Sequence, residues 1–194
     1  MLRPGFRDPV HDAQGVFRAV LDALARPGTI HAISTHLDPP QPLTPELAAI
    51  ALALTDGDTP VWLDPALAAS PEVAAYLRFH TGAPLTDDPA RAAFAFVREA
   101  GRCPPLAAFA QGTPAYPDGS TTLVLALDAL DTGAGLRFTG PGIRGTADLA
   151  LAPMPPGWPG ALRENHAGFP LGVDGLLTAP GRVAGLPRST AVEG

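Results

Sequence analysis

Proline and glycine divide this chain into short apolar segments. Its 194 residues include 24 prolines and 21 glycines, which punctuate the apolar stretches and do not form runs of their own. The longest uninterrupted apolar run, residues 47–54, is too short to span a bilayer. We therefore expect an ordered chain of short helices and strands joined by frequent turns, with residues 1–194 forming a single domain.

The charge of the chain argues against a nucleic-acid surface. The formal net charge is −6 and the pI is about 5.2, and the basic residues are spread singly along the sequence. A nucleic-acid footprint needs clustered Lys or Arg. The first residues contain no apolar core of the signal-peptide type. We therefore expect a cytoplasmic protein that binds neither nucleic acid nor membrane.

Two absences restrict the chemistry further. All 13 basic residues are arginines, and a chain without lysine cannot anchor pyridoxal phosphate or build a P-loop. Cys103 is the only cysteine, so an intrachain disulfide and Cys-pair metal motifs are excluded. No two histidines have the HxxxH or HExxH spacing of a local zinc site. We expect neither a cofactor nor a metal.

Apolar periodicity and start signals predict the helices. Two helices open with a hydroxyl cap, a proline and an acid, at Thr44-Pro45-Glu46 and Ser70-Pro71-Glu72. The expected helices are residues 12–26, 44–55, 70–80 and 159–166, with a short helix at 104–110 and a single turn from 87.

Short apolar runs bounded by turn residues predict the strands. They are residues 29–33, 59–63, 94–98, 120–127, 136–139, 173–179 and 183–186, with a turn at 131–135. Pro180-Gly181-Arg182 would join the last two strands as a hairpin. Because strands alternate with helices over short loops, we expect an α/β fold, a mixed sheet flanked by helices.

Six residues are candidates for a ligand or interface role. They are Asp58, Trp62, Arg78, His80, Asp174 and Arg188. Several adjoin short strands, where α/β folds place ligands, although turn capping and core filling explain Asp58 and Trp62 equally well. His80 can be a general base or a cation favoured at a helix C-terminus. For Asp174 and Arg188 we prefer a structural ion pair. These residues contain no nucleophile–base pair, so no catalytic residue is assigned.

An ordered set of short motifs extends over most of the chain. It comprises Phe17-Arg18 with Arg26-Pro27-Gly28, Asp58-Thr-Pro-Val-Trp-Leu63, Arg78-Phe-His-Thr81, Gly112-Thr113 with Pro117 to Thr122, Thr139-Gly-Pro-Gly-Ile143, Phe169-Pro-Leu-Gly-Val-Asp174 and Leu186-Pro-Arg188. Each motif is weak alone, but the set in this order resembles the PhnH family, the H subunit of the bacterial carbon–phosphorus lyase machinery.

The resemblance implies a fold, partners and a pathway. The fold would be that of pyridoxal-phosphate-dependent transferases without the cofactor, which agrees with the missing lysine. The protein would form a homodimer and join the G, I and J subunits in a core complex. That complex makes ribose 1-methylphosphonate 5-triphosphate from ATP and methylphosphonate. The family assigns nucleosidase chemistry to the I subunit and radical C–P cleavage to the J subunit, so no catalytic residue carries over.

Three functions remain open at this point. The first is an accessory, non-catalytic subunit of the phosphonate-degrading complex. The second is a phosphonate- or nucleotide-binding subunit of the same pathway, in which Arg78, His80, Asp174 and Arg188 line an anion pocket, since guanidinium groups bind phosphate oxygens bidentately. The third, a free-standing enzyme such as a small hydrolase, is the weakest, because no nucleophile–base pair is visible.

Overall fold

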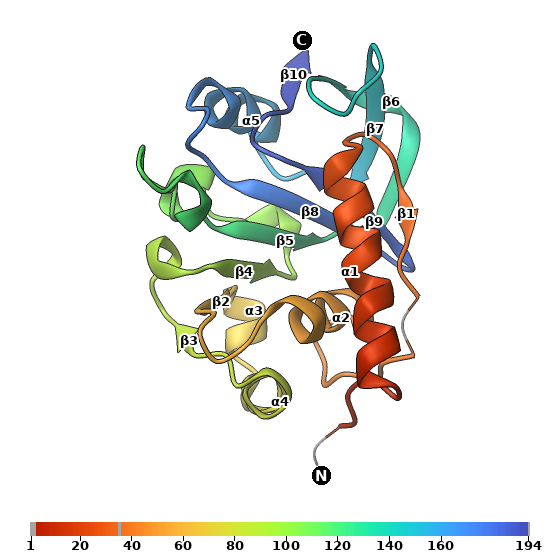
Figure 1. The fold of residues 1–194 in the computed structure, drawn as a ribbon, viewed down its shortest axis with the longest axis vertical. Helices are drawn as coiled ribbons and strands as arrows, with labels where there is room; N and C mark the ends of the chain where they lie inside the picture. Colours follow the sequence, from red (N-terminus) through yellow and green to blue (C-terminus); the bar gives the residue numbers. More distant parts are fainter. Residues whose placement is uncertain (1–2, 35, 194) are drawn as a thin grey trace.

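A seven-stranded mixed sheet forms the centre of the computed structural model, which describes residues 3–34 and 36–193 (Figure 1). The strand order is β1-β9-β8-β5-β4-β2-β3. Strands β3, β2, β4, β5 and β8 are parallel, whereas β9 and β1 run antiparallel to their neighbours. The bounds are β1 His31–Ala32, β2 Val61–Leu63, β3 Leu85–Thr86, β4 Phe94–Val97, β5 Thr122–Ala126, β8 Asp174–Ala179 and β9 Arg182–Leu186.

Four helices cover one face of this sheet. They are α1 Pro9–Ala25, α2 Pro45–Leu54, α3 Pro65–Ala68 and α4 Pro71–Thr81, and their buried side chains share one apolar core with that face. Each begins with a proline that follows a capping side chain, namely Asp8, Thr44, Asp64 and Ser70. Proline suits the first helical position because its missing N–H would have had no intrahelical partner. The proline-rich composition is thus used to start helices.

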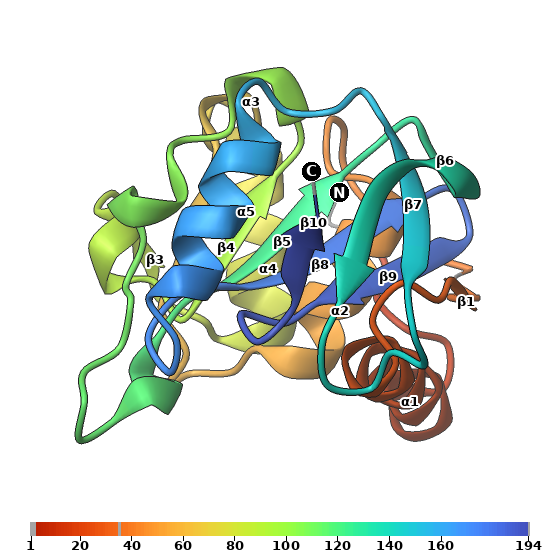
Figure 2. The same cartoon turned by 90° about the horizontal axis from the view of Figure 1, so that it is seen from above.

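The opposite face is covered mainly by a second sheet. Strands β6 Ala129–Thr139, β7 Ala147–Ala152 and β10 Ala191–Glu193 form it in the order β10-β6-β7, and α5 Trp158–Ala167 lies beside it. Figure 2 shows α5, β6 and β7 on one side of β8 and β9, with α1 on the other. Apolar side chains from both sheets and α5 form the second core. The expectation of a sheet flanked by helices therefore describes one face fully, and the opposite face only through α5.

The predicted turn at residues 131–135 is wrong. These residues continue β6, and the pairing with β7 shifts register between Thr132 and Leu136. At Gly135 a Cβ atom would lie 2.0 Å from the carbonyl oxygen of Leu149, so the glycine permits close approach of the strands and does not mark a turn. Strands β7 and β10 and the short α3 were not expected.

The other helices and strands lie within a few residues of their predicted positions. The short helix expected at 104–110 and the single turn expected from 87 are 3₁₀ turns, at Leu106–Ala108 and Pro89–Arg91. Two further 3₁₀ turns form at Ala100–Arg102 and Pro117–Gly119. The predicted hairpin joins β8 to β9, and Gly181 in its turn has a φ of 70°. Among the described residues, no helix is long and apolar enough to cross a membrane.

The carboxylate of Asp64 ties three elements together. Asp64 is 1% exposed and follows β2 directly. Its Oδ1 accepts the Leu67 N–H at the start of α3, and its Oδ2 accepts the N–H groups of Arg98 and Glu99 just after β4, all at 2.9 Å. Three donors that would otherwise lie in a poorly solvated region are thus satisfied by one side chain.

We predict that Asp64→Ala lowers the free energy of unfolding by about 3 kcal/mol, because it removes a helix cap and leaves backbone donors without an acceptor. Urea denaturation followed by circular dichroism would measure the loss. Asp87→Ala is the matched control, since Asp87 is exposed and has no hydrogen bond within the described residues; it should change stability by less than about 0.5 kcal/mol. Equal effects of the two substitutions would contradict the assignment.

Candidate functional site

Trp62 and Arg78 line a hollow at one edge of the main sheet. It has a volume of about 510 Å³, and its other lining residues are Leu63, Pro65, Ala68, Ala74, Leu85, Thr86 and Asp87. Trp62 is 8% exposed, and its ring packs edge-on against that of Phe109, with the ring centroids 5.7 Å apart. The Arg78 guanidinium, on the last turn of α4, forms no ion pair or hydrogen bond with the described residues. Besides its apolar wall, this hollow therefore has, among the described residues, one free cation, Arg78, and one free carboxylate, Asp87.

His80 is held by the N-terminal segment. Its Nε2 lies 3.0 Å from the carbonyl oxygen of Arg3, so that nitrogen carries the proton in this contact. Its ring also packs edge-on against Tyr76 and Phe79, with centroid distances of 4.5 and 5.0 Å. These contacts give His80 a structural role, the attachment of the residues before α1 to α4.

Asp58 lies in the exposed turn before β2. Its backbone N–H donates to Asp56 Oδ1 at 3.0 Å. The hydroxyl of Thr59 donates to the same oxygen at 2.6 Å, and these two hydrogen bonds, that from Thr59 first, lower the pKa of Asp56. Asp56 therefore organises this turn, and the carboxylate of Asp58 is not among the groups lining the hollow beside Trp62.

Asp174 and Arg188 form the ion pair that we expected from the sequence. The guanidinium is bidentate, with Nε 3.1 Å from Oδ1 and Nη2 2.5 Å from Oδ2, and the Arg188 backbone N–H also donates to Oδ1 at 2.8 Å. The remaining nitrogen, Nη1, donates to the carbonyl oxygen of Pro117 at 2.6 Å. The Arg188 side chain is 13% exposed and the Asp174 side chain is 24% exposed. The pair fastens the start of β8 to the loop before β5.

The structure brings four of the six candidates together, as two separate pairs: Trp62 with Arg78, and Asp174 with Arg188. Trp62 is on β2 and Asp174 on β8, and strands β4 and β5 lie between them. Three inter-strand spacings amount to about 14 Å. The predicted anion pocket of Arg78, His80, Asp174 and Arg188 therefore does not form as one constellation in the structure.

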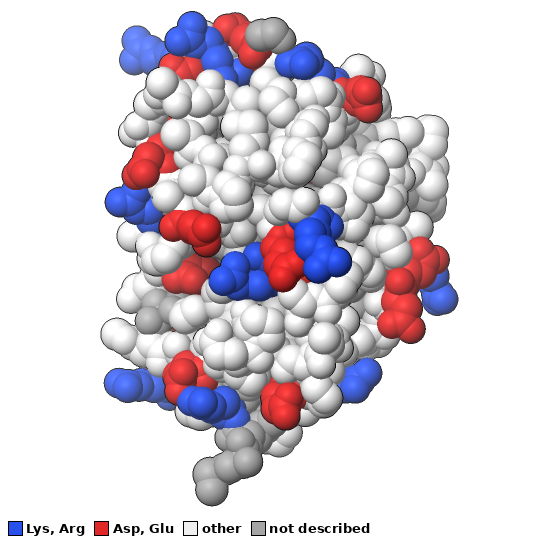
Figure 3. All heavy atoms as spheres, turned by 180° about the vertical axis from the view of Figure 1, so that it is seen from behind, with Lys and Arg blue, Asp and Glu red and all other residues white. Residues whose placement is uncertain are grey.

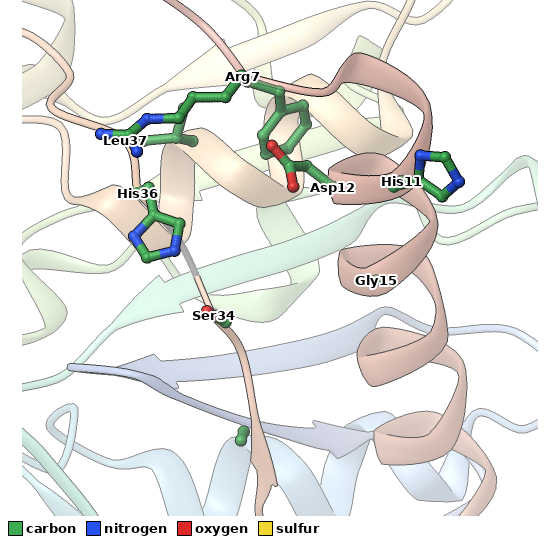
Figure 4. A pocket seen from close by; sticks show the side chains of 9 residues that line it. Arg7, His11, Asp12, Gly15, Ser34, His36 and Leu37 are labelled. Atoms are coloured by element: carbon green, nitrogen blue, oxygen red, sulfur yellow. The ribbon is translucent and has the colours of Figure 1, made fainter.

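A second hollow lies beside the first turn of α1 (Figure 4). It has a volume of about 260 Å³, and Arg7, Asp12, Ser34 and His36 face it. The Asp12 carboxylate accepts the Asp8 N–H at 3.1 Å and so serves the helix start. No motif in the sequence pointed to these residues, because the two segments meet only through folding.

Metal and thiol chemistry receive no support from the described residues. Within residues 3–34 and 36–193, no three His, Cys, Asp or Glu side chains are placed to share a metal ion. Burial, together with the nearby negative charge of Asp64, raises the pKa of Cys103 to about 12. The thiolate, which is the nucleophile, is therefore scarce at neutral pH.

Charged side chains are dispersed on the surface in Figure 3. Positive and negative groups stand next to one another between wide uncharged areas, and no basic patch gathers on this face. Several form exposed ion pairs, among them Arg26 with Asp22 and Arg137 with Asp148. Exposed pairs of this kind contribute little to stability.

We predict that Arg188→Ala lowers the free energy of unfolding by about 2–3 kcal/mol, because Asp174 is left partly buried without its bidentate partner. The value is below that of a fully buried pair, since both side chains keep some exposure. Arg144→Ala is the matched control: Arg144 is exposed and unpaired within the described residues. Urea melts of the two variants would decide, and a change below about 0.5 kcal/mol for Arg188→Ala would contradict the structural role.

Comparison with known proteins gives consistent results over nearly the whole chain. Residues 4–193 match the family described as bacterial phosphonate metabolism protein (PhnH). A Rhizobium meliloti (strain 1021) protein, the alpha-D-ribose 1-methylphosphonate 5-triphosphate synthase subunit PhnH, is 45% identical over 188 residues, which are 97% of this chain and 94% of that protein. HtxG of Stutzerimonas stutzeri, a candidate C-P lyase subunit, is 38% identical over 81 residues, 42% of each chain. The chain therefore belongs to the PhnH family of bacterial phosphonate metabolism proteins.

Proposed function

We propose that the chain is an accessory subunit of the complex that makes alpha-D-ribose 1-methylphosphonate 5-triphosphate in carbon–phosphorus lyase phosphonate degradation. The observation that carries the proposal is the 45% identity to the Rhizobium meliloti synthase subunit over 97% of this chain and 94% of that protein. Coverage at both ends means that the likeness involves the whole subunit and is not confined to one shared segment.

A non-catalytic role fits the geometry of the candidate residues. The Cys103 thiol has a pKa raised to about 12 by burial and by Asp64. His80 is hydrogen-bonded to a main-chain carbonyl, and Arg188 uses its donors on Asp174 and Pro117. None of these groups is arranged as a nucleophile with its base. The bond-making steps would then belong to other subunits of the complex.

The proposed partners are a second copy of the chain and the G, I and J subunits, in the cytoplasm. Exposed apolar side chains support partner contacts, because such groups mark interfaces when they gather on one surface. Val10, Phe17 and Leu21 are each more than half exposed, at spacings that place them on one side of α1. Tyr116 and Phe169 are exposed aromatic residues on loops.

The finer fold assignment is part of the same proposal. A cofactor-less relative of the pyridoxal-phosphate-dependent transferase fold is supported by the mixed seven-stranded sheet with helices on one face and by the absence of lysine. A single domain is supported by the two apolar cores, since both are built on the same central sheet.

A ligand-binding role is the second candidate. The pocket expected from Arg78, His80, Asp174 and Arg188 is not supported. The Arg188 guanidinium already donates to Asp174 and Pro117, and strands β4 and β5 separate its partner strand β8 from β2, beside which Arg78 lies. Arg78 alone keeps a free guanidinium in the hollow beside Trp62. An anion site made of these four residues together is therefore not part of the proposal.

Co-expression with the G, I and J subunits of the same organism tests the proposal. A tag on this chain should recover the three partners in one peak on size exclusion, and the Rhizobium meliloti relative with its own partners is the positive control. Because a stable subunit interface holds at micromolar concentration or tighter, the peak should survive dilution to that range. Elution of this chain alone, when the control complex stays intact, would contradict the proposal.

A further inference from the structure

A small cavity lies at the carboxyl ends of three parallel strands. It has a volume of about 240 Å³ and is bordered by the residues after β4, β5 and β8 and by the first turn of α2. The three strands point the same way in the sheet (Figure 1). In open α/β sheets the carboxyl ends of parallel strands are where ligands bind. The groups that matter here are Arg98, Glu46, Asp128, Thr44 and Thr178.

Arg98 brings a free guanidinium to this cavity. Its backbone is fixed, because its N–H donates to the buried carboxylate of Asp64 at 2.9 Å. Its side chain is half-buried and forms no hydrogen bond or ion pair with the described residues. A guanidinium has five N–H donors, and partial burial of a charge without a partner is unfavourable. Its donors are therefore available to a group from outside the chain.

Glu46 brings a carboxylate to the same cavity. It is 8% exposed, and its Oε1 accepts the Gly181 N–H at 2.9 Å. Its Oε2 has no hydrogen-bond donor among the described residues, and the carboxylate does not pair with Arg98 although both line the cavity. Asp128 adds an exposed carboxylate that is likewise without a partner in the described chain. The carboxylates of Glu46 and Asp128 and the guanidinium of Arg98 therefore line the same cavity without forming an ion pair.

The two threonines hold fixed positions around this space. The Thr44 hydroxyl accepts the Leu47 N–H at 3.2 Å, as the cap of α2. The Thr178 hydroxyl donates to the carbonyl oxygen of Leu125 at 3.1 Å, and Thr178 is 1% exposed. Each hydroxyl oxygen keeps a further lone pair. The walls are thus organised by secondary structure before any ligand enters, which reduces the entropy lost on binding.

We propose that this cavity binds a small phosphate or phosphonate ester that also carries hydroxyl groups. Arg98 receives the oxyanion, since guanidinium matches its oxygens bidentately. Glu46 and Asp128 receive the hydroxyl donors, as acidic residues do with ribose hydroxyls. A bare phosphate fits poorly, because it would meet two carboxylates and offer them few protons. This ligand class rests on the proposed function and deepens it, since it names what the subunit would bind.

Calorimetry with ribose 5-phosphate at neutral pH tests the inference on the full chain. We expect binding to the wild-type protein, and Arg98→Gln should weaken it about 10- to 100-fold, the range for losing hydrogen bonds to a charged group. Arg91→Gln is the matched control, since Arg91 is exposed near the other end of β4 and is also without a partner among the described residues. It should leave the affinity unchanged. Thermal melts establish that each variant is folded.

Glu46→Gln separates a binding role from a packing role. The amide oxygen can still accept the Gly181 N–H, but the negative charge is gone, so ribose 5-phosphate should bind more weakly while inorganic phosphate binds as well or better. Absence of ribose 5-phosphate binding at millimolar concentration, or equal affinities of wild type and Arg98→Gln, would overturn the inference. Tighter binding of 2-aminoethylphosphonate than of ribose 5-phosphate would overturn the hydroxyl assignment. Association with the G, I and J subunits is read separately, so loss of either result is distinguishable from loss of the other.

Discussion

The carboxylate of Asp64 joins three elements that are separate in the sequence. Through three backbone N–H groups at 2.9 Å it connects the end of β2, the start of α3 and the residue pair after β4. In a region of low dielectric these bonds are strong, and their absence would leave donors unsatisfied. Burial raises the pKa of the nearby Cys103 thiol, and the negative charge of Asp64 adds to that effect.

The two edges of the parallel sheet have different properties. At the amino edge, Asp174 and Arg188 use their polar groups on each other and on Pro117. At the carboxyl edge, Asp64 holds the backbone of Arg98 and leaves its guanidinium free beside Glu46. Groups that are already paired within the protein stabilise the fold, whereas fixed but unpaired groups can bind a ligand. A binding role therefore belongs at the carboxyl edge.

Local signals in the sequence predicted most of the helices, because a cap and a proline act within a few residues. The pattern that starts α2 and α4 also starts α3, but four residues are too few to show a helical period, so Asp64 was missed. The glycines at 133 and 135 were interpreted as a turn, although Gly135 serves a close contact between β6 and β7. The Asp174–Arg188 pair was predicted because both residues flank one hairpin. The meeting of Arg98 and Glu46 could not be predicted from the sequence, since only the packing of α2 against the end of β8 brings them to one cavity.

The most direct test of this division is an NMR titration of the isotope-labelled chain with ribose 5-phosphate, following every backbone amide. We predict that the amides of Arg98, Thr178 and Gly181 shift together and saturate, while those of Asp174 and Arg188 stay in place. Saturable shifts centred on Asp174 and Arg188, with none at Arg98, would contradict it.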